Sequence, residues 1–249
     1  MKKTIETLMN HRSVRKFKDV ELTKSQIKTI VSAAQMASTS SFIQAYTIIG
    51  VTDKEKKKKL AALAGGQEYV AESGHLFIFC ADLYRHSLIG EWENADVTPS
   101  IESTEKFMVT LIDAALAAQN AAIAAESMGL GICYIGGIRN ELNEVNKIID
   151  APDYVLPLFG LTVGVPDQHT EVKPRMPFSM VYHENTYQKE PELLKRNLDE
   201  YNQQLSAYYD KRTQGLRNDG WSDQMAKMLQ RKSRMYMKEF VEGKKLNRH

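Results

Sequence analysis

Two short segments rich in permanent positive charge are the first candidates for chemistry in this sequence. They are HRSVR at residues 11–15 and KPR at residues 173–175. Guanidinium groups bind phosphate and other delocalised anions through paired hydrogen bonds, and lysine adds a compact charge. HRSVR alone is also compatible with the solvated end of a helix. Together the segments suit a phosphate and a second anionic group, with the candidate residues His11, Arg12, Ser13, Arg15, Lys173 and Arg175.

A third segment, YIGG at Tyr134–Gly137, pairs an aromatic ring with two glycines. Glycine lets a backbone approach a ligand closely, so this segment is suited to lie against a flat molecule. The residues before it do not form a dinucleotide-binding loop, because Tyr134 stands where G-x-G-x-x-G needs its third glycine. Gly129 and Gly131 are typical of a turn after a helix. The three segments outline a site for a nucleotide-like cofactor.

A basic loop, RTQGLR at Arg212–Arg217, lies between helical stretches near the C-terminus. One interpretation is a surface connection. The other is a clamp for a second anionic ligand, such as the 2′-phosphate of NADPH, with Arg212 and Arg217 as the donors. The loop alone does not distinguish the two.

The overall composition is that of an ordinary globular protein. Of the 249 residues, 43% are hydrophobic and 26% are charged, and the formal net charge is +2. This balance favours neither a nucleic acid nor a membrane surface as a partner. The lysine run at residues 56–59 is interpreted as the solvated face of a helix.

Cysteine content and the absence of known motifs exclude several classes of function. Cys80 and Cys133 lie in apolar surroundings, and there is no CxxC pair or Cys/His cluster, so we expect neither a metal nor a disulfide scaffold. The sequence has no HExxH, no P-loop and no Ser/His/Asp order, which argues against hydrolases and kinases. Because we find no signal peptide and no apolar run near ~20 residues, we expect a cytoplasmic protein.

Helix and strand signals must position these segments. Thr23 and Gln26 form a capping-box pattern that predicts a helix start, and Asp53 predicts another before the lysine run. The longest expected helix covers residues 104–128 and ends at Gly129. Its apolar residues lie on more than one face, which requires burial on several sides or a dimer interface.

The remaining elements follow from shorter signals. Continuous or β-branched apolar content predicts strands at residues 46–51, 75–81 and 154–165. We further expect a short helix over 4–10, a polar loop over 38–41, a polar excursion or lid over 86–100, a helix from Asn140 to Ile149, and helices without strands beyond Glu190.

Two ionisable residues outside the cationic segments are interpreted as structural. His75 precedes an apolar strand, and Asp113 lies inside the long helix with no partner that the sequence reveals. Strands and helices intermingle up to about Val165, and a helical extension follows. The pattern therefore predicts an α+β or α/β domain with a C-terminal extension.

Nearly the whole chain resembles the FMN-dependent nitroreductase superfamily, and within it the NADPH-preferring branch of oxygen-insensitive nitroreductases and flavin reductases. The resemblance rests on several segments taken together, since HRSxR alone is not specific. These segments are HRSVRKF, STSSFIQ at Ser38–Gln44, AGGQ at Ala64–Gln67, AAESMGLGICYIGGIRN at Ala124–Asn140, LPLFGLTVG at Leu156–Gly164, KPR, HEN at His183–Asn185 and WSD at Trp221–Asp223.

The resemblance implies an α+β fold with a mixed sheet surrounded by helices, in an intertwined homodimer with two FMN sites at the subunit interface. It implies an FMN-binding domain at residues 1–189 and a helical extension at 190–249 that contacts NADPH through Arg212 and Arg217. The family commonly has serine where Thr39 stands. The residues implied to bind FMN are His11, Arg12, Ser13, Arg15, Thr39, Ser40, Gln67, Tyr134, Ile135, Gly136, Gly137, Lys173 and Arg175.

The implied activity is two-electron, ping-pong hydride transfer from NADPH through FMN to nitroaromatics, quinones or free flavins. The chemistry belongs to the cofactor, while the protein supplies binding and electrostatics, with Arg15 and Lys173 as the cationic support. Three alternatives stay open: a dedicated flavin reductase that supplies reduced FMN to a partner, a flavin-binding protein without turnover, and a basic helical interaction protein.

Overall fold

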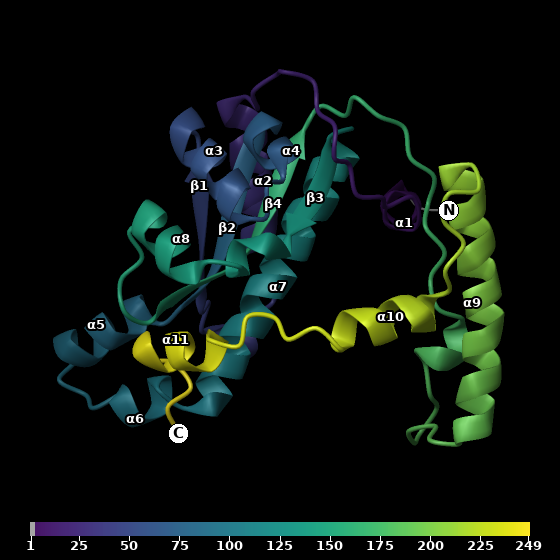
Figure 1. Ribbon diagram of the computed structural model, residues 1–249. Helices are drawn as coiled ribbons and strands as arrows, with labels where there is room; N and C mark the ends of the chain where they lie inside the picture. Colours follow the sequence, from purple (N-terminus) through teal and green to yellow (C-terminus); the bar gives the residue numbers. More distant parts are fainter. Residues whose placement is uncertain (1–2) are drawn as a thin grey trace. The chain divides into compact units, whose positions relative to one another are not determined.

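The computed structural model describes residues 3–249, and this part of the chain forms two compact units (Figure 1). The first unit contains the residues up to Thr170 together with Arg234–His249. The second unit is Glu171–Ser233. The expected division at residues 189 and 190 stays a prediction.

A four-stranded sheet in the order β1-β2-β4-β3 forms the middle of the first unit. All three ladders between these strands are antiparallel, and Ser13 adds an isolated parallel bridge to Ile132. β1 and β3 are therefore the two edge strands. The strands are β1 (Tyr46–Val51), β2 (His75–Asp82), β3 (Gly131–Ile135) and β4 (Val155–Gly164).

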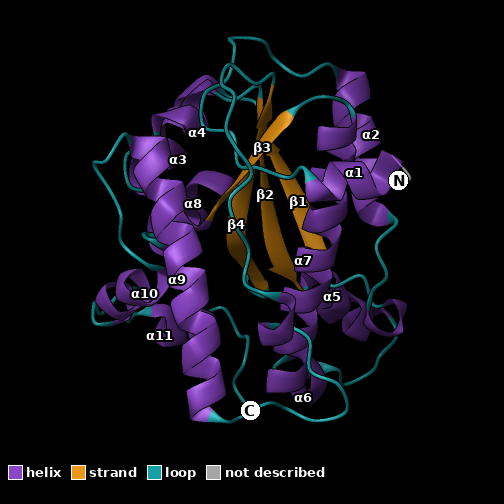
Figure 2. Ribbon diagram, turned by 90° about the vertical axis from the view of Figure 1, so that its right-hand side faces the viewer, coloured by secondary structure: helices purple, strands orange, loops and turns teal. Residues whose placement is uncertain are grey.

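Helices cover both faces of the sheet (Figures 1 and 2). Alternate residues of β2 point to opposite faces and enter two separate apolar clusters, with Phe77 on the side of α7 and Ile78 on the side of α3. The helices of the first unit are α1 (Lys3–Met9), α2 (Lys24–Gln35), α3 (Lys54–Leu63), α4 (Glu68–Glu72), α5 (Tyr84–Trp92), α6 (Thr98–Ile101), α7 (Thr104–Ser127), α8 (Leu142–Ile149) and α11 (Met237–Gly243), with 3-10 turns η1 (Ser40–Phe42) and η2 (Gly136–Arg139).

The two predicted helix starts are confirmed. The hydroxyl of Thr23 accepts the Gln26 N–H at 3.2 Å, and the Gln26 side chain accepts the Thr23 N–H at 2.9 Å. Asp53 accepts the Lys56 N–H at 2.8 Å. These bonds satisfy amides that the first turn of a helix leaves without partners.

The long helix α7 packs one face against the sheet and leaves another exposed. Its buried face carries small residues, among them Ala114, Ala117, Ala118, Ala121 and Ala125, which allow close packing. Its length and apolar composition also meet the criteria for a membrane span, but a buried core helix of a globular protein meets the same criteria. The opposite face exposes a stripe at helical spacing, Met108, Ile112 and Leu116.

Several sequence expectations are corrected by the structure. The segment 86–100, expected to be a polar excursion or lid, contains most of α5 and part of α6, and its role as a lid stays a prediction. Asn140 does not cap α8, which begins after Glu141; its side-chain oxygen instead accepts two hydrogen bonds from Arg234, at 3.1 and 2.8 Å. The strand β3 was not expected, because its glycine-rich start was interpreted as a turn.

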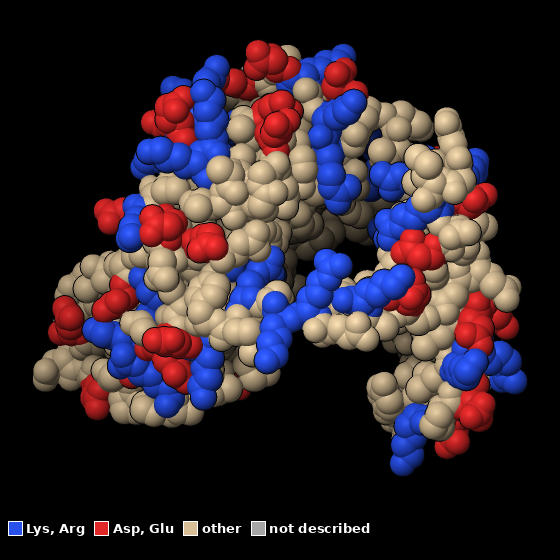
Figure 3. All heavy atoms as spheres, in the orientation of Figure 1, with Lys and Arg blue, Asp and Glu red and all other residues tan. Residues whose placement is uncertain are grey.

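The lysine run on α3 is a solvated face with one exception. Its other members are exposed, and basic and acidic side chains are interspersed on the face shown in Figure 3. Lys57 is buried and donates a hydrogen bond to the carbonyl of Ser73. Burial lowers the pKa of this lysine, with Lys54 adding to the effect and Glu21 opposing it.

The second unit is built on α9 (Pro191–Thr213) and α10 (Trp221–Leu229), preceded by the 3-10 turn η3 (Phe178–Met180). Asn202 of α9 joins the two helices, since its side chain donates to the Ser222 hydroxyl and accepts the Ser222 N–H at 3.0 Å. The expectation of helices without strands beyond Glu190 is confirmed for the described residues.

Candidate functional site

The N-terminal cationic segment crosses the start of β3. Ser13 forms its bridge to Ile132, and the Val14 N–H donates to the Ile132 carbonyl at 2.8 Å. Val14 lies directly over Gly131, where an added Cβ would come within 2.8 Å of the valine side chain. Gly131 is therefore required by the crossing of this segment, and HRSVR is attached to the sheet.

Arg15 lies against a group of side chains from two other elements. Its guanidinium interacts with the Tyr69 hydroxyl of α4 and the Cys133 thiol of β3. Burial raises the pKa of both groups, and Arg15 opposes the rise. The Tyr69 hydroxyl donates to Gln67, whose amide nitrogen donates to the Ala64 carbonyl at 2.9 Å. Both ends of the Gln67 amide are thus engaged, which fixes its position.

The AGGQ and YIGG turns pack against each other. A Cβ on Gly137 would lie 2.3 Å from the carbonyl oxygen of Ala64, so only glycine fits there. Close packing between the turns, rather than a ligand, accounts for this glycine. Gly66 has φ +70° and nothing within 4 Å of its missing side chain, and a Cβ on Gly136 would approach only Arg139, at 3.5 Å. These two glycines leave open space at the surface of the turns.

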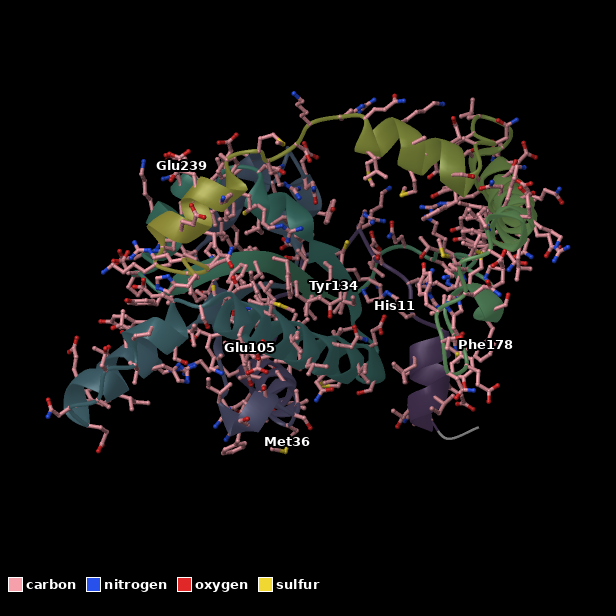
Figure 4. All side chains as sticks on the ribbon, turned by 90° about the horizontal axis from the view of Figure 1, so that it is seen from below. His11, Met36, Glu105, Tyr134, Phe178 and Glu239 are labelled. Carbon is pink, nitrogen blue, oxygen red and sulfur yellow. The ribbon has the colours of Figure 1, made fainter. Side chains whose placement is uncertain are left out.

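His11 and Tyr134 lie close together beside the end of α7 (Figure 4). Nδ1 of His11 is 2.8 Å from a carboxylate oxygen of Glu126. The Tyr134 hydroxyl donates to Gln119 at 3.3 Å, and its ring meets the edge of Phe159. Burial, followed by the charge of Glu126, raises the pKa of Tyr134. No signal in the sequence had selected Glu126 or Gln119 as neighbours of the site.

Arg12 points to a different place from Arg15. It lines a cavity of about 500 Å³ together with Glu126 and His169, and its guanidinium donates to the Asn10 carbonyl at 3.1 Å. The structure thus brings a subset of the expected cofactor residues together around the start of β3 and the two glycine turns. We call this subset the β3 cluster: His11, Ser13, Arg15, Gln67, Tyr134, Ile135, Gly136 and Gly137.

Within one chain, Thr39 and Ser40 lie away from the β3 cluster. They begin the segment Thr39–Ala45, here the 39–45 loop, which leads into the other edge strand, β1. The Ser40 N–H donates to Asp113 of α7 at 3.1 Å, whereas His11 contacts Glu126 of the same helix. Thirteen residues of α-helix separate these two acids, or about 20 Å at 1.5 Å per residue. A single chain therefore does not bring all the predicted FMN-binding residues around one ligand.

Lys173 and Arg217 of the second unit share an aromatic platform. Nζ of Lys173 lies 5.1 Å from the centre of the Tyr209 ring, and the Arg217 guanidinium lies 3.8 Å from it. Tyr209 is buried on α9, and no signal in the sequence selected it. Arg217 is also held by Asp219, with two contacts at 2.6 and 3.1 Å. Its positive charge is therefore already partly neutralised.

Arg212 and Arg175 are more available. Arg212 donates to the Tyr208 hydroxyl at 3.2 Å, and Arg175 donates to the Lys173 carbonyl at 2.9 Å. Both side chains are exposed. Neither contact neutralises a positive charge, so both guanidinium groups keep full charge for an anionic ligand.

Within residues 3–249, no group of three or more His, Cys, Asp or Glu side chains has the arrangement of a metal site. Both cysteines are buried free thiols, and burial raises the pKa of each. The expected absence of a metal cofactor stays a prediction.

Comparison with protein families assigns the chain to a family. The Nitroreductase family model matches residues 8–165, and the model for the Nitroreductase family, C-terminal domain, matches residues 173–249. The chain belongs to the nitroreductase family. The α+β fold implied by the resemblance is confirmed by solved relatives, since B. megaterium NfrA1 superposes with a TM-score of 0.97 at 60% identity, over 98% of this chain and 99% of that one.

Other members of the family carry informative names. FMN reductase (NADPH) of Bacillus subtilis (strain 168) is 53% identical over 100% of both chains. NADPH:FMN oxidoreductase from Vibrio harveyi, solved as a complex with NAD+, is 39% identical, with a TM-score of 0.89 and 99% of each chain covered. These are similar proteins, and their similarity extends over both units of this chain.

The residues of the first unit fit a flavin. The open surface beside Gly66 and Gly136 can admit a flat ring, and the exposed Arg15 guanidinium and the Ser13 segment offer donors to anionic oxygens. The Gln67 amide, fixed at both ends, can present a polar group at a defined position. The donor set suits FMN better than a metal.

Proposed function

We propose that this protein is an FMN-dependent NADPH oxidoreductase that reduces nitroaromatics, quinones or free flavins. The observation that carries the proposal is the β3 cluster. There, the HRSVR segment meets the AGGQ and YIGG turns, which are distant from it in sequence. Arg15 lies beside Tyr69, whose hydroxyl donates to Gln67. The family membership and the NADPH-linked names of the relatives support the same reading.

The residues of the β3 cluster have separable tasks in this proposal. Ser13 and Arg15 bind the anionic parts of FMN, and Arg12, which lies outside the β3 cluster, stays a predicted FMN ligand. The backbone of residues 134–137 and the Gln67 side chain orient the ring. FMN supplies the two-electron chemistry when bound, while Arg15 and Lys173 stabilise negative charge on it. No side chain of the chain is required as an acid or base, because water can supply the proton.

The 2′-phosphate of NADPH is assigned to Arg212 and Arg217. Arg212 is supported by its exposure and its contact with a neutral hydroxyl. Arg217 is supported by its position in the same loop, although Asp219 competes with a phosphate for its guanidinium. Lys173 and Arg175 stay predicted FMN ligands.

The active form is proposed to be an intertwined homodimer with FMN at the subunit interface. The exposed stripe Met108, Ile112 and Leu116 on α7 offers an apolar surface for a second copy. The homodimer is proposed to bring Thr39 and Ser40 of one protomer to the β3 cluster of the other. Replacing Ile112 with Asp is expected to give monomers in sedimentation velocity and to release FMN; a dimer that retains FMN would contradict this arrangement.

A dedicated flavin reductase is the second candidate function. The names of the B. subtilis and V. harveyi relatives favour it, since both include FMN as the molecule acted on. The ratio of kcat/KM for free FMN to that for a nitroaromatic separates the two functions. A ratio well above one supports the flavin reductase, and a ratio well below one supports the broader reductase.

The proposal is tested by steady-state kinetics of the purified protein after reconstitution with FMN. NADPH oxidation that depends on a nitroaromatic or quinone, with parallel double-reciprocal plots, is expected from one site that serves donor and acceptor in turn. Intersecting plots would reject the shared site, and no turnover would reject the enzyme. A cytoplasmic location, without a nucleic-acid, membrane or metal partner, is part of the proposal.

A further inference from the structure

The backbone of the 39–45 loop is held by side chains from two other elements. Asp113 of α7 accepts from both ends of the loop, from the Ser40 N–H at 3.1 Å and from the Ala45 N–H at 3.0 Å. One carboxylate oxygen serves each amide. Asp113 is fully buried, and a buried carboxylate is retained only when its oxygens are well hydrogen-bonded.

The helix α5 donates hydrogen bonds to carbonyl groups at the end of the loop and at the start of β1. Arg85 donates to the Tyr46 carbonyl at 2.6 Å and to the Gln44 carbonyl at 3.3 Å. Nε2 of His86 lies 2.9 Å from the Ile43 carbonyl, so it is the nitrogen that carries the proton. The segment 86–100, expected to be an excursion or lid, thus supplies one contact to the loop through His86, while Arg85 directly before it supplies the others.

The shape that these contacts impose is unfavourable for the residues in it. Ser41, Phe42 and Gln44 have φ of +48°, +58° and +53°, in the left-handed region that non-glycine residues rarely adopt. Such conformations persist where the surroundings fix them, and they concentrate at functional sites. Inside the loop, Thr39 adds one contact by accepting the Gln44 N–H at 3.3 Å.

Ala45 and Ile43 at the end of the loop pack in the core, but burial does not explain the shape of the loop tip. Phe42 is 81% exposed at the loop tip, and Ser41 is exposed beside it. A loop with no external task has no reason to combine unfavourable torsions, a buried carboxylate and two α5 donors. The contacts are better explained by the need to present Thr39 and Ser40 in one orientation.

We propose that Asp113, assisted by Arg85 and His86, is a positioning residue that holds Thr39 and Ser40 in the geometry that binds FMN. This inference rests on the proposed function, because it assigns these two hydroxyl residues to the flavin. Asp113 itself does not touch the ligand. Its carboxylate fixes the two ends of the loop, and the loop places the hydroxyl groups.

The test uses the full-length protein with Asp113→Asn. This substitution keeps the size of the side chain but replaces one acceptor oxygen with an NH₂ group, which faces a backbone N–H and cannot bond it. We expect the Kd for FMN to rise about tenfold, the change expected from losing one charge-assisted hydrogen bond. At saturating FMN, kcat should stay within about twofold, because the groups beside the ring are unchanged.

A matched control is Thr110→Val. Thr110 is fully buried one turn before Asp113 on α7, and its hydroxyl bonds only within the helix, to the Phe107 carbonyl. It should leave the Kd for FMN unchanged. Hydrogen exchange of a peptide covering residues 40–45 gives an independent readout, and it should accelerate in Asp113→Asn but not in Thr110→Val.

Arg85→Gln is the second variant, needed if Asp113→Asn does not fold. The Arg85 side chain is 56% exposed, so its removal spares the core. It should raise the Kd for FMN about threefold and accelerate exchange in the same peptide. If the wild type binds FMN and neither variant changes the Kd for FMN, the positioning role is overturned. A wild type that binds no FMN would instead reject the proposed function, while faster exchange would still show that Asp113 fixes the loop.

Discussion

The two units of the chain hold their basic residues in different ways. In the first unit, Arg15 interacts with the hydroxyl of Tyr69 and the thiol of Cys133, which carry no charge at neutral pH. In the second unit, Arg217 forms a two-contact ion pair with Asp219 and stacks on Tyr209. Arg15 is thus fixed without being neutralised, whereas Arg217 is fixed by neutralisation.

This difference indicates which positive charges are ready for a ligand. A guanidinium held by neutral groups keeps its full attraction for an anion, while one paired with a carboxylate must give up that partner. Arg15 is therefore suited to an anion that stays bound, such as a resident cofactor. Arg217 is suited to an anion that binds and leaves, because the phosphate and Asp219 exchange places on it, while Arg212 in the same loop keeps its full charge.

Burial in the first unit should produce the largest pH effect. Burial, with Lys57 adding to it, lowers the pKa of His75 from 6.5 to about 4. The unfolded chain therefore takes up the proton first, and stability present above pH 6.5 is lost as the pH falls towards 4. In the wild type, the free energy of unfolding should fall by up to about 3 kcal/mol between pH 6.5 and 4 because of His75. His75→Gln should abolish this part of the decrease, as measured by urea unfolding at several pH values.

The matched control for His75 is His169→Gln, since His169 is exposed. It should keep the wild-type pH dependence. Equal slopes for wild type and His75→Gln between pH 4 and 6.5 would show that the buried imidazole does not create the difference.

Arg15→Ala should give the next largest effect. Loss of a charge-assisted contact to a bound anion costs about 1.5–3 kcal/mol, so the Kd for FMN should rise about tenfold to a hundredfold. Fluorescence quenching of FMN on titration with the protein measures this. Lys16→Ala removes an exposed positive charge one residue away and should change Kd little. Equal effects of the two substitutions would mean that only overall charge matters.

Arg212→Ala should raise KM for NADPH about tenfold and leave KM for NADH nearly unchanged, because only NADPH carries the 2′-phosphate. Arg217→Ala should have a smaller effect in the same direction, since Asp219 already engages that guanidinium. Initial rates with both reductants measure the ratio. A larger effect at Arg217 than at Arg212 would mean that Asp219 does not make Arg217 less available to the phosphate.

Asp219→Asn should give the smallest effect, and in the opposite direction. Without the carboxylate, Arg217 regains its full charge, and KM for NADPH should fall about twofold to threefold, as expected for a partly exposed ion pair. Lys227→Met is a useful control, because it removes an exposed positive charge near Asp219 without freeing Arg217. A rise in KM for Asp219→Asn would mean that Asp219 orients Arg217 for the phosphate.

Local signals predicted most of the fold. The capping box at Thr23 and the cap at Asp53 are visible in sequence because their partners lie three residues away. The strand β1 was predicted over its full length from β-branched residues. β3 was missed because Gly129 and Gly131 suggest a turn, and the reason for Gly131 is Val14, more than a hundred residues earlier in the chain.

The site was harder to predict, because its determinants are distant in sequence. Asp113 had no visible role until the fold placed Ser40 and Ala45 against it. Gly137 was interpreted as a ligand contact, but the packing of Ala64 also requires a glycine there. Lys173 and Arg217 both contact the ring of Tyr209, and the spacing of these residues in the sequence does not indicate this. The resemblance to the family indicated the cofactor. The structure divides the predicted site residues among the β3 cluster, the 39–45 loop and the second unit.

The most direct test is an anaerobic titration of the FMN-reconstituted protein with NADPH, followed by the visible absorbance of the flavin. We predict that FMN copurifies or binds stoichiometrically, that one equivalent of NADPH bleaches its absorbance, and that a nitroaromatic or quinone restores it. A protein that binds no FMN, or whose bound FMN keeps its absorbance in excess NADPH, would contradict it.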